Sequence, residues 1–489
     1  MRQGSLARQI WNDLLPGPDR LGGTIRITFA ALLVAVVMLT FRMPFLYIGP
    51  YLVFILSQKD TFFTRAAAGL GLGVALIASL TIYIVAWLAW DCGWLRIVLW
   101  GGIFYGGYFL MRVAVEPRAI LGPLVVVALL AFAFDLSPDP NRVISTLGWL
   151  WAILGLVVAS TFLTQWLFGA PTGIEVLRRQ VRQLLAENER AILACAFGSD
   201  HAAASDRWEE ERDDALGRVE KLWMAGILSP AQQDNCERLL RACEMCAKAL
   251  EAPPANPPRT TLIALAACVR RLRQAVLSGC MNLLPARWPS TEDLPPTLQV
   301  AARALAAASD QLRTPTGSVP SRTSSGVLLE DWKTNPAYTD FALRAMLATV
   351  GCYLFMTLVN WNGIHTCMIT CAVTALAGMG AQMHKQNLRL AGALLGGALG
   401  IGAVVFVIPH LDSMGAYLAV LAIGTALAAW VSLGSERISY AGWQIGLAFY
   451  MTVLQDPHPT TKLDIIRDRW VGIFVGIVAM RAAFARRKF

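Results

Sequence analysis

The amino-acid sequence predicts an all-α membrane protein. It is expected to contain about 12 transmembrane helices, arranged as two parallel six-helix repeats with a cytoplasmic helical domain inserted between them. Of its 489 residues 56% are hydrophobic and only 15% are charged, whereas soluble domains carry about a quarter charged residues. The apolar residues gather in blocks, with charged residues between the blocks and in one long central segment. The two groups of apolar blocks also resemble each other along the chain.

A helix that crosses the hydrocarbon core of a bilayer needs about 20 apolar residues. Six such segments are predicted in residues 1–170, the first transmembrane repeat, and six more in residues 337–489, the second repeat. The predicted spans are residues 21–40, 44–57, 66–90, 94–111, 119–134 and 143–168 in the first repeat, and 337–359, 364–380, 390–408, 414–433, 438–454 and 465–484 in the second.

Residues 171–313, between the two repeats, have a different pattern. Apolar residues recur there every three or four positions, as in Leu177, Val181 and Leu184, which predicts amphipathic helices in a small bundle. Residues 314–336 are rich in Ser, Thr, Pro and Gly and are predicted to form a flexible linker. The pair Cys243 and Cys246 has the spacing of metal ligands, but no second pair follows, so we interpret both as packing residues and predict no metal.

The charged residues predict the orientation in the membrane. An even number of spans in each repeat places the N-terminus, the central insert and the C-terminus on one side. That side carries roughly fifteen Lys and Arg residues at span ends and the other side roughly six, so the positive-inside rule assigns it to the cytoplasm. Residues 1–20 are polar, and we expect the first span to be kept as an uncleaved anchor. The net charge of +9 is explained by the bilayer, not by nucleic acid.

Single residues recur at a constant spacing in the two halves. The recurring pairs are Arg26 and Arg344, 318 positions apart, Arg118 and Arg437, 319 positions apart, and Trp151 and Trp470, also 319 positions apart. Because each half has an even number of spans, the repeats are predicted to be parallel and related by an axis along the membrane normal.

Two local sequences are typical of a known family. The segment Arg-Leu-Ala-Gly-Ala-Leu-Leu-Gly, residues 389–396, begins the third span of the second half. The segment Trp-Asn-Gly-Ile-His-Thr, residues 361–366, lies between the first and second spans of the same half. Together with the two six-span halves and the helical insert, these segments resemble the fusaric acid resistance and aromatic acid exporter family of bacterial inner-membrane proteins. The first half departs from this pattern, with Met-Pro-Phe at residues 43–45 in place of Trp-Asn-Gly.

The resemblance implies efflux of aromatic carboxylic acids or related toxic compounds, driven by the proton gradient as in an antiporter. It also implies two protein partners, a periplasmic adaptor of the membrane fusion type and an outer-membrane channel. The membrane lipids and the small organic anion are the other expected partners, and a homodimer is left open.

Arg26 and Arg344 are the strongest candidates for a substrate pathway. Each lies a turn or two inside a predicted span, where a buried arginine costs about 2.5–3.5 kcal/mol on insertion scales and normally faces a cavity or a partner. The planar guanidinium also matches the two oxygens of a carboxylate. The alternative is that both side chains extend to lipid phosphates at the membrane interface.

Other residues are candidates for weaker reasons, each with a structural alternative. Arg65 and Arg389 begin glycine-rich helices, which can pack closely and line the substrate pathway. The alternative is that these arginines anchor their helices as positive charges on the cytoplasmic side. Aromatic walls for the substrate are predicted at Trp361, Trp443 and Trp470, whose alternative role is anchoring at the membrane interface. Proton coupling is predicted at His365, Asp135 and Asp456, and the alternative for the acids is turn formation. A cytoplasmic gate is predicted at Glu116, Arg118, Glu436 and Arg437, and the alternative is surface ion pairing.

The sequence contains no Gly-Lys pair and therefore no phosphate-binding loop, and it lacks His-Glu-x-x-His and Gly-x-Ser-x-Gly. We therefore predict a transporter that is not an enzyme and carries no cofactor. Two other functions stay open, a passive anion channel and a membrane scaffold or sensor that acts through the cytoplasmic helical domain.

Overall fold

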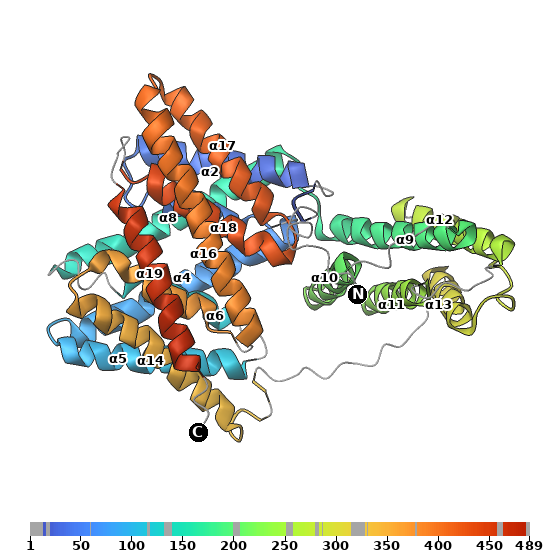
Figure 1. Ribbon diagram of the computed structural model, residues 1–489, viewed down its shortest axis with the longest axis horizontal. Coiled ribbons are helices and arrows are strands. Elements are labelled where there is room, and N and C mark those ends of the chain that lie inside the picture. Colours follow the sequence, from blue (N-terminus) through green and yellow to red (C-terminus); the bar gives the residue numbers. More distant parts are fainter. Residues whose placement is uncertain are drawn as a thin grey trace. The chain divides into compact units, whose positions relative to one another are not determined.

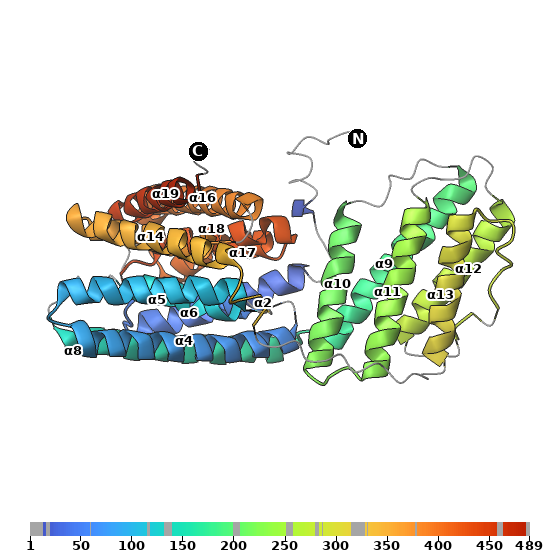
Figure 2. The same ribbon diagram turned by 90° about the horizontal axis from the view of Figure 1, so that it is seen from below.

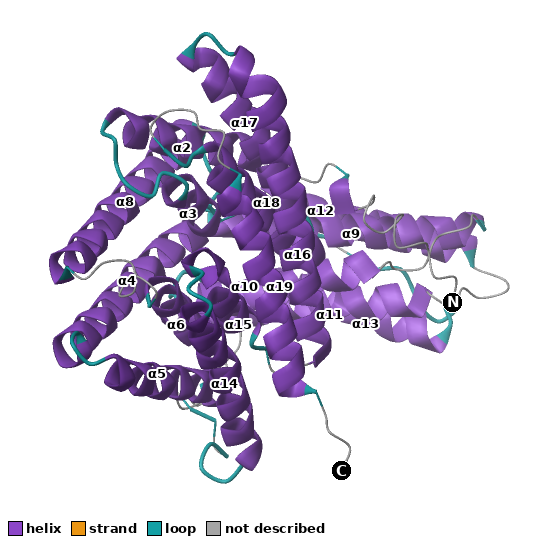
Figure 3. Ribbon diagram, turned by 60° about the vertical axis from the view of Figure 1, so that its left-hand side comes forward, coloured by secondary structure: helices purple, strands orange, loops and turns teal. Residues whose placement is uncertain are grey.

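The structure is a computed structural model with two compact units. One unit is formed by Met1–Ala170 with Ser324–Phe489, and the other by Pro171–Thr323. The described residues are helical or lie in loops, apart from an isolated bridge between Ala114 and Leu328, and none of them forms a strand (Figure 3). The structure describes residues 13–15, 20–58, 60–114, 118–131, 139–198, 206–250, 258–278, 283–285, 287–313, 328–329, 331–376, 379–456 and 463–485.

In the unit formed by Met1–Ala170 and Ser324–Phe489, called the membrane unit below, polar side chains cap two helices of the first half. The carboxylate of Asp60 accepts a hydrogen bond from the backbone N–H of Phe63 at the start of α4, and Asp139 caps α8 in front of Pro140. Both residue types are favoured in these positions because they satisfy free backbone donors. The helices are α2 (Arg20–Thr40), α3 (Ile48–Leu56), α4 (Thr61–Ala89), α5 (Gly93–Val113), α6 (Arg118–Leu130) and α8 (Pro140–Leu167).

The second half begins in a similar way, since Asn335 caps α14 in front of Pro336. Near its far end α16 changes to a π-helical turn, Ala403–Val407, and then to a 3-10 turn, Ile408–His410. The helices are α14 (Pro336–Leu358), α15 (Thr366–Thr374), α16 (Met379–Gly402), α17 (Met414–Ser432), α18 (Glu436–Val453) and α19 (Asp464–Phe484).

Seven of the described helices are long and apolar enough to cross a membrane. They make the chain a multi-pass membrane protein. The other helices of the membrane unit fall short for identifiable reasons: α3 and α15 have nine residues each, α6 has 13, and α18 and α19 both begin with charged residues. The layout of twelve spans in two repeats therefore remains a prediction. The seven candidate spans are Arg20–Thr40, Thr61–Ala89, Gly93–Val113, Asn141–Leu167, Pro336–Leu358, Gly380–His410 and Met414–Ser432.

The contacts between helices follow one pattern in both halves. Helix α2 contacts α17 and α5 contacts α14, so the first helix of each half packs against the fourth helix of the other half. In the same way α3 contacts α18 and α6 contacts α15. In Figure 2 the helices of the second half, coloured orange to red, lie above those of the first half, coloured blue to cyan. Such reciprocal contacts are expected of two copies of one unit related by a pseudo-two-fold axis.

Each of the two large apolar cores draws on both halves. One core contains buried residues of α2, α3 and α8 together with residues of α17 and α18, and the other combines α4, α5 and α6 with α14 and α15. Trp100 and Phe54 are among the largest side chains in these cores and are at most 1% exposed.

The second unit is a bundle of helices that lie side by side (Figure 2). Thr172 and Glu175 form a reciprocal capping box at its first helix, which fixes the helix start. Cys243 and Cys246 are fully buried in its core, which favours their interpretation as packing residues. The placement of this unit in the cytoplasm remains a prediction, and most of the predicted linker lies outside the described residues. The helices are α9 (Gly173–Phe197), α10 (Asp206–Met224), α11 (Pro230–Leu250), α12 (Arg259–Ser278) and α13 (Pro296–Arg313).

The cysteines of α11 give a testable prediction. Burial raises the pKa of the Cys246 thiol to about 12. Burial together with the nearby Glu237 raises the pKa of the Cys236 thiol to about 11. Because the thiolate is the reactive form, we expect neither thiol to react with iodoacetamide in the folded protein at pH 8, and both to react after denaturation. Peptide mass spectrometry measures this, and rapid labelling of Cys246 in the native protein would contradict the packing interpretation.

Candidate functional site

Two helices at corresponding places in the two halves, α3 and α15, are unusually short. Each has nine residues and follows an irregular segment with a left-handed residue, Phe45 with φ of 57° before α3 and Asn360 with φ of 54° before α15. Short, interrupted membrane helices at matching positions of two repeats are the best structural indication of a transporter binding site. The residues around α3 and α15 are therefore the first place to look for polar groups.

Arg389 lies next to α15 and is almost completely buried. Its side chain projects from α16, ten residues after the helix start, and is 2% exposed. Its Nε donates a hydrogen bond to Thr370 Oγ1 on α15 (3.0 Å), and its Nη1 donates to the Tyr440 hydroxyl (3.1 Å) and to Gln444 Oε1 (3.3 Å), both on α18. The guanidinium is thus held by uncharged groups of two neighbouring helices.

A second buried arginine, Arg469, reaches the same glutamine from α19. It is 3% exposed, and its Nη2 donates a hydrogen bond to Gln444 Oε1 at 3.0 Å. Its Nη1 lies 3.3 Å from the sulfur of Met451, a weak acceptor, and its buried Nε has no hydrogen-bond partner in the described part of the chain. Arg469 is therefore less well satisfied than a buried guanidinium normally is.

The two guanidinium groups share one oxygen atom and form a concentrated positive charge. Neither forms an ion pair with an Asp or Glu among the described residues. The nearby phenols of Tyr47, Tyr51 and Tyr440 are among the groups that interact with Arg469 electrostatically. Two like charges in an apolar protein interior are unfavourable unless a counter-ion compensates them. We call Arg389, Arg469 and Gln444 the arginine site.

Glycines of α16 bring α18 close enough to form this site. A Cβ atom at Gly392 would lie 2.6 Å from the carbonyl oxygen of Ala441 and 2.7 Å from Cβ of Gln444, and one at Gly396 would overlap the backbone of Ile445. The spacing of four residues places these glycines on one face of the helix, and such small residues allow the backbones of membrane helices to approach. The first half differs, because the space beside Gly69 and Gly73 of α4 is open.

Three predicted residues lie beside the arginine site. Trp443 precedes Gln444 and packs edge to face with Tyr440, with ring centroids 6.3 Å apart. Trp470 follows Arg469, and its indole N–H donates to the carbonyl of Ala393 (3.0 Å). The third is His365, which interacts electrostatically with Arg469 and Asp468 and whose Nδ1 lies 3.1 Å from the carbonyl oxygen of Asn362.

The segment 361–366 owes part of its sequence to this neighbourhood. A Cβ at Gly363 would overlap the carboxylate of Asp468, so glycine lets the chain pass the start of α19. The guanidinium of Arg467 lies over the ring of Trp361 at 5.7 Å from its centroid. Trp361 therefore borders the start of α19 and does not contact the arginine site through any described hydrogen bond.

The structure does not bring Arg26 and Arg344 together with the arginine site. Arg344 is 38% exposed and its Nε donates to Asp340, one turn earlier in α14, at 2.9 Å. Nη1 of Arg26 lies 3.4 Å from where a Cβ of Gly22 would be, also one turn earlier in its own helix. Both side chains thus fold back toward the starts of their helices, which favours the interfacial alternative for them.

The other predicted residues are scattered. Arg65 is exposed at the start of α4, and Arg437 is exposed, with its carbonyl 3.1 Å from Nε2 of His384. Asp456 is partly buried after α18. Asp135 and Glu116 lie outside the described residues, as do the side chains of Arg118 and Glu436.

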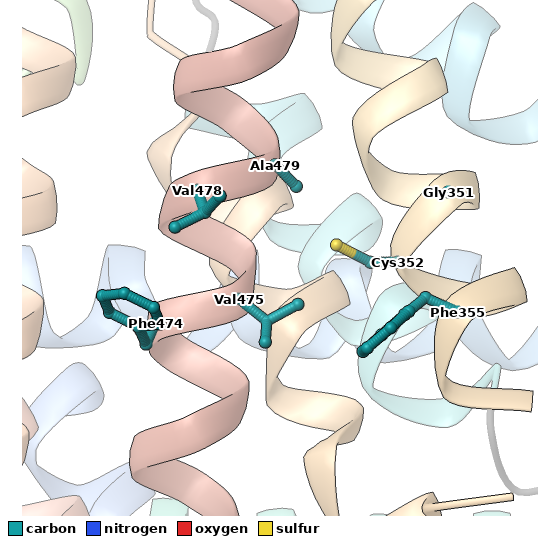
Figure 4. Close-up of a pocket in the computed structure, with 7 residues that line it drawn as sticks. All are labelled: Gly351, Cys352, Phe355, Phe474, Val475, Val478 and Ala479. Atoms are coloured by element: carbon teal, nitrogen blue, oxygen red, sulfur yellow. The ribbon is translucent and has the colours of Figure 1, made fainter. Parts of the chain in front are cut away.

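An apolar pocket of about 250 Å³ lies elsewhere, between α14 and α19 (Figure 4). Figure 4 shows Phe355 and Cys352 of α14 opposite Val475 of α19. The Sγ atom of Cys352 lies 3.6 Å from the Sγ atom of Cys371 on α15, and neither cysteine forms a disulfide. The pocket offers apolar contact but no charged group, so it cannot compensate an anion. The lining residues are Gly351, Cys352, Phe355, Phe474, Val475, Val478 and Ala479.

Sequence reasoning found Arg389 but missed Arg469 and Gln444. One signal was available: at the spacing of 319 that pairs Trp151 with Trp470, Arg469 and Gln444 correspond to Leu150 and Val125. Charged or polar residues in place of apolar ones at a repeated position indicate a function that the scaffold does not require.

The chain, whose helices are shown in Figure 1, has one group of relatives by amino-acid sequence among the known proteins compared. The chain is 27% identical over 482 residues to the multidrug resistance protein MdtO of Escherichia coli O157:H7 and to that of Escherichia coli strain K12, and 27% identical over 480 residues to MdtO of Shigella flexneri. These alignments cover 94% of this chain and 68% of each relative. No family model matches the chain, and no solved structure matches it.

Proposed function

We propose that this chain is an inner-membrane efflux transporter. The chain is homologous to the multidrug resistance protein MdtO, which confirms the predicted relationship to the aromatic acid exporter family. Its substrates are drugs or toxic compounds, and more narrowly aromatic carboxylates or related small organic anions. The substrate carboxylate binds at the arginine site.

The observation that carries this proposal is the pair of buried arginines that share Gln444 without an acidic partner among the described residues. A membrane protein retains such residues where they face a substrate path or a compensating partner. A carboxylate supplies the missing negative charge and accepts charge-assisted hydrogen bonds from both guanidinium groups. The Nε of Arg469, which has no acceptor in the part of the chain that the structure describes, adds one more donor for the carboxylate.

The neighbours of the arginine site suit an aromatic substrate. Tyr440, whose hydroxyl contacts Arg389, packs edge to face with Trp443. In the other half, Tyr51 of α3 and Tyr47 directly before it interact electrostatically with Arg469. Aromatic walls with few polar groups are typical of small-molecule sites. The site therefore combines a charged end for the carboxylate with apolar surface for a ring.

The proposal includes a driving force, a topology and partners. The proton gradient drives export, and His365, which interacts electrostatically with Arg469 and Asp468, is the candidate for coupling. The termini and the insert lie in the cytoplasm, where the excess of Lys and Arg places them. A periplasmic adaptor and an outer-membrane channel complete the export path, as the family resemblance implies.

Transport of benzoate by the purified protein in proteoliposomes tests the function. We expect accumulation against a benzoate gradient when a pH gradient is imposed, and slower transport of benzamide, which has the same shape but no charge. Benzoate flux that only follows its own gradient would identify a passive anion channel instead. Absence of flux for both compounds would favour a scaffold or sensor.

A further inference from the structure

Gln444 occupies the position that a substrate carboxylate would take. Its Oε1 lies 3.0 Å from Nη2 of Arg469 and 3.3 Å from Nη1 of Arg389, so a single oxygen accepts hydrogen bonds from both guanidinium groups. The side chain is 1% exposed. This is the arrangement that one oxygen of a bound carboxylate would have, with an uncharged amide in its place.

We propose that Gln444 is an internal competitor of the substrate, a residue whose amide oxygen closes the arginine site when it is empty and is displaced when an organic carboxylate binds. The inference rests on the proposed function. It adds a role that the function itself does not require, because a site could hold two arginines around a glutamine that contacts the substrate directly.

The chemistry of the three groups favours displacement. A neutral amide oxygen satisfies two cations only in part, whereas a carboxylate adds a negative charge and forms stronger hydrogen bonds with both. An amide is nevertheless better than no acceptor, since an unsatisfied buried donor is costly. Gln444 thus stabilises the empty site. A carboxylate displaces its amide oxygen from the arginines, whereas a neutral amide does not.

The surroundings of Gln444 allow it to approach the arginines at the required distance. Gly392 lies one turn after Arg389 on α16, and its missing side chain makes room for Cβ of Gln444, as the 2.7 Å to an added Cβ shows. Gln444 is the residue of α18 that both arginines contact. The corresponding residue of the first half is Val125, so this competition is built into one half of the chain.

Two substitutions of Gln444 act in opposite directions. Gln444→Met keeps the length of the side chain but removes the competing oxygen, so benzoate affinity is expected to rise by about ten-fold, while the ligand-free protein melts at a lower temperature. Gln444→Glu places a permanent carboxylate between the arginines, so benzoate affinity is expected to fall by about a hundred-fold, while the ligand-free protein melts at a higher temperature. If Gln444 had only a structural role, a variant with a lower melting temperature would not bind benzoate more tightly, and a variant with a higher melting temperature would not bind it more weakly.

The measurement is equilibrium binding of radiolabelled benzoate to the full-length protein in detergent, with benzamide as competitor and a melting curve for each variant. Gln386 provides the matched control. It is also fully buried and accepts a hydrogen bond from an arginine, Arg481 Nε at 3.2 Å, but lies outside the arginine site. Gln386→Glu and Gln386→Met should leave benzoate affinity unchanged.

Weaker benzoate binding by Gln444→Met would overturn the inference, because it would make Gln444 a direct ligand of the substrate. The variants Arg389→Gln and Arg469→Gln separate this outcome from failure of the proposed function. If benzoate binding survives both arginine substitutions, the arginine site itself is wrong. If both abolish binding and Gln444→Met weakens it, the site stands and only the competition is refuted.

Discussion

Replacing Arg469 with glutamine is expected to lower benzoate transport by about ten- to a hundred-fold at matched membrane expression. The buried guanidinium already donates to Gln444, and its Nε has no hydrogen-bond partner among the described residues. A charge-assisted hydrogen bond to a carboxylate is worth about 1.5–3 kcal/mol. Arg389→Gln is expected to have a similar effect. Both arginines act on one oxygen, so their effects are not independent. The double variant should therefore lose less benzoate transport than the product of the two single fold-losses.

Lysine at either position should give an intermediate result, because it keeps the charge but loses the planar fork. Benzamide transport should change little in all of these variants. An equal loss for benzoate and benzamide would assign a structural role to the arginines.

Arg344→Gln and Arg26→Gln are the matched controls for charge loss. Arg344 is paired with Asp340 within its own helix, and such pairs contribute about 0.3–0.5 kcal/mol, so benzoate transport should stay within about two-fold. The repeat in the sequence predicts the opposite, a carboxylate pathway at these two residues. If these control variants lost transport while the Arg469 and Arg389 variants transported benzoate normally, the substrate pathway would lie at the starts of α2 and α14 and not at the arginine site.

The glycine face of α16 gives the second large effect. A methyl group in Gly396→Ala would overlap the backbone of Ile445, so α16 and α18 must move apart. Overpacking of this kind costs about 1–3 kcal/mol and sometimes more. We expect a clear drop in the melting temperature in detergent and a lower yield of monodisperse protein.

Gly73→Ala in α4 is the control, since α4 is the third helix of the first half as α16 is of the second. Nothing lies within 4 Å of the Cβ position of Gly73, and alanine is a better helix former than glycine by about 1 kcal/mol. This variant should be as stable as the unsubstituted protein or slightly more stable. Similar melting temperatures for Gly396→Ala and Gly73→Ala would show that α16 and α18 are not closely packed.

Hydropathy predicts the order of the helices well because an apolar stretch of sufficient length has few alternatives to a buried or membrane helix. It fails at the second helix of each half. The predicted segments 44–57 and 364–380 contain α3 and α15, which have only nine residues. Hydropathy reports the surroundings of a residue, not its backbone conformation, so the irregular backbone around Phe45 and Asn360 is invisible to it.

The arginine site was predictable only in part. Arg389 could be found because it begins a glycine-rich span, as Arg65 does in the first half. Arg469 follows Asp464, Arg467 and Asp468, so it looks like part of a charged span end. Gln444 is separated from the two arginines by 55 and 25 residues, and nothing in the local sequence indicates that tertiary packing joins them.

The mixed cores have a consequence for synthesis on the ribosome. Residues of α2 and α3 share a core with α17 and α18, and residues of α5 and α6 share one with α14 and α15. The candidate spans of the first half are therefore made long before their packing partners are translated, and the chain of the second unit is made in between. Neither half has a complete core of its own, so early helices depend on lipid or on insertion factors until translation of the last helices is finished.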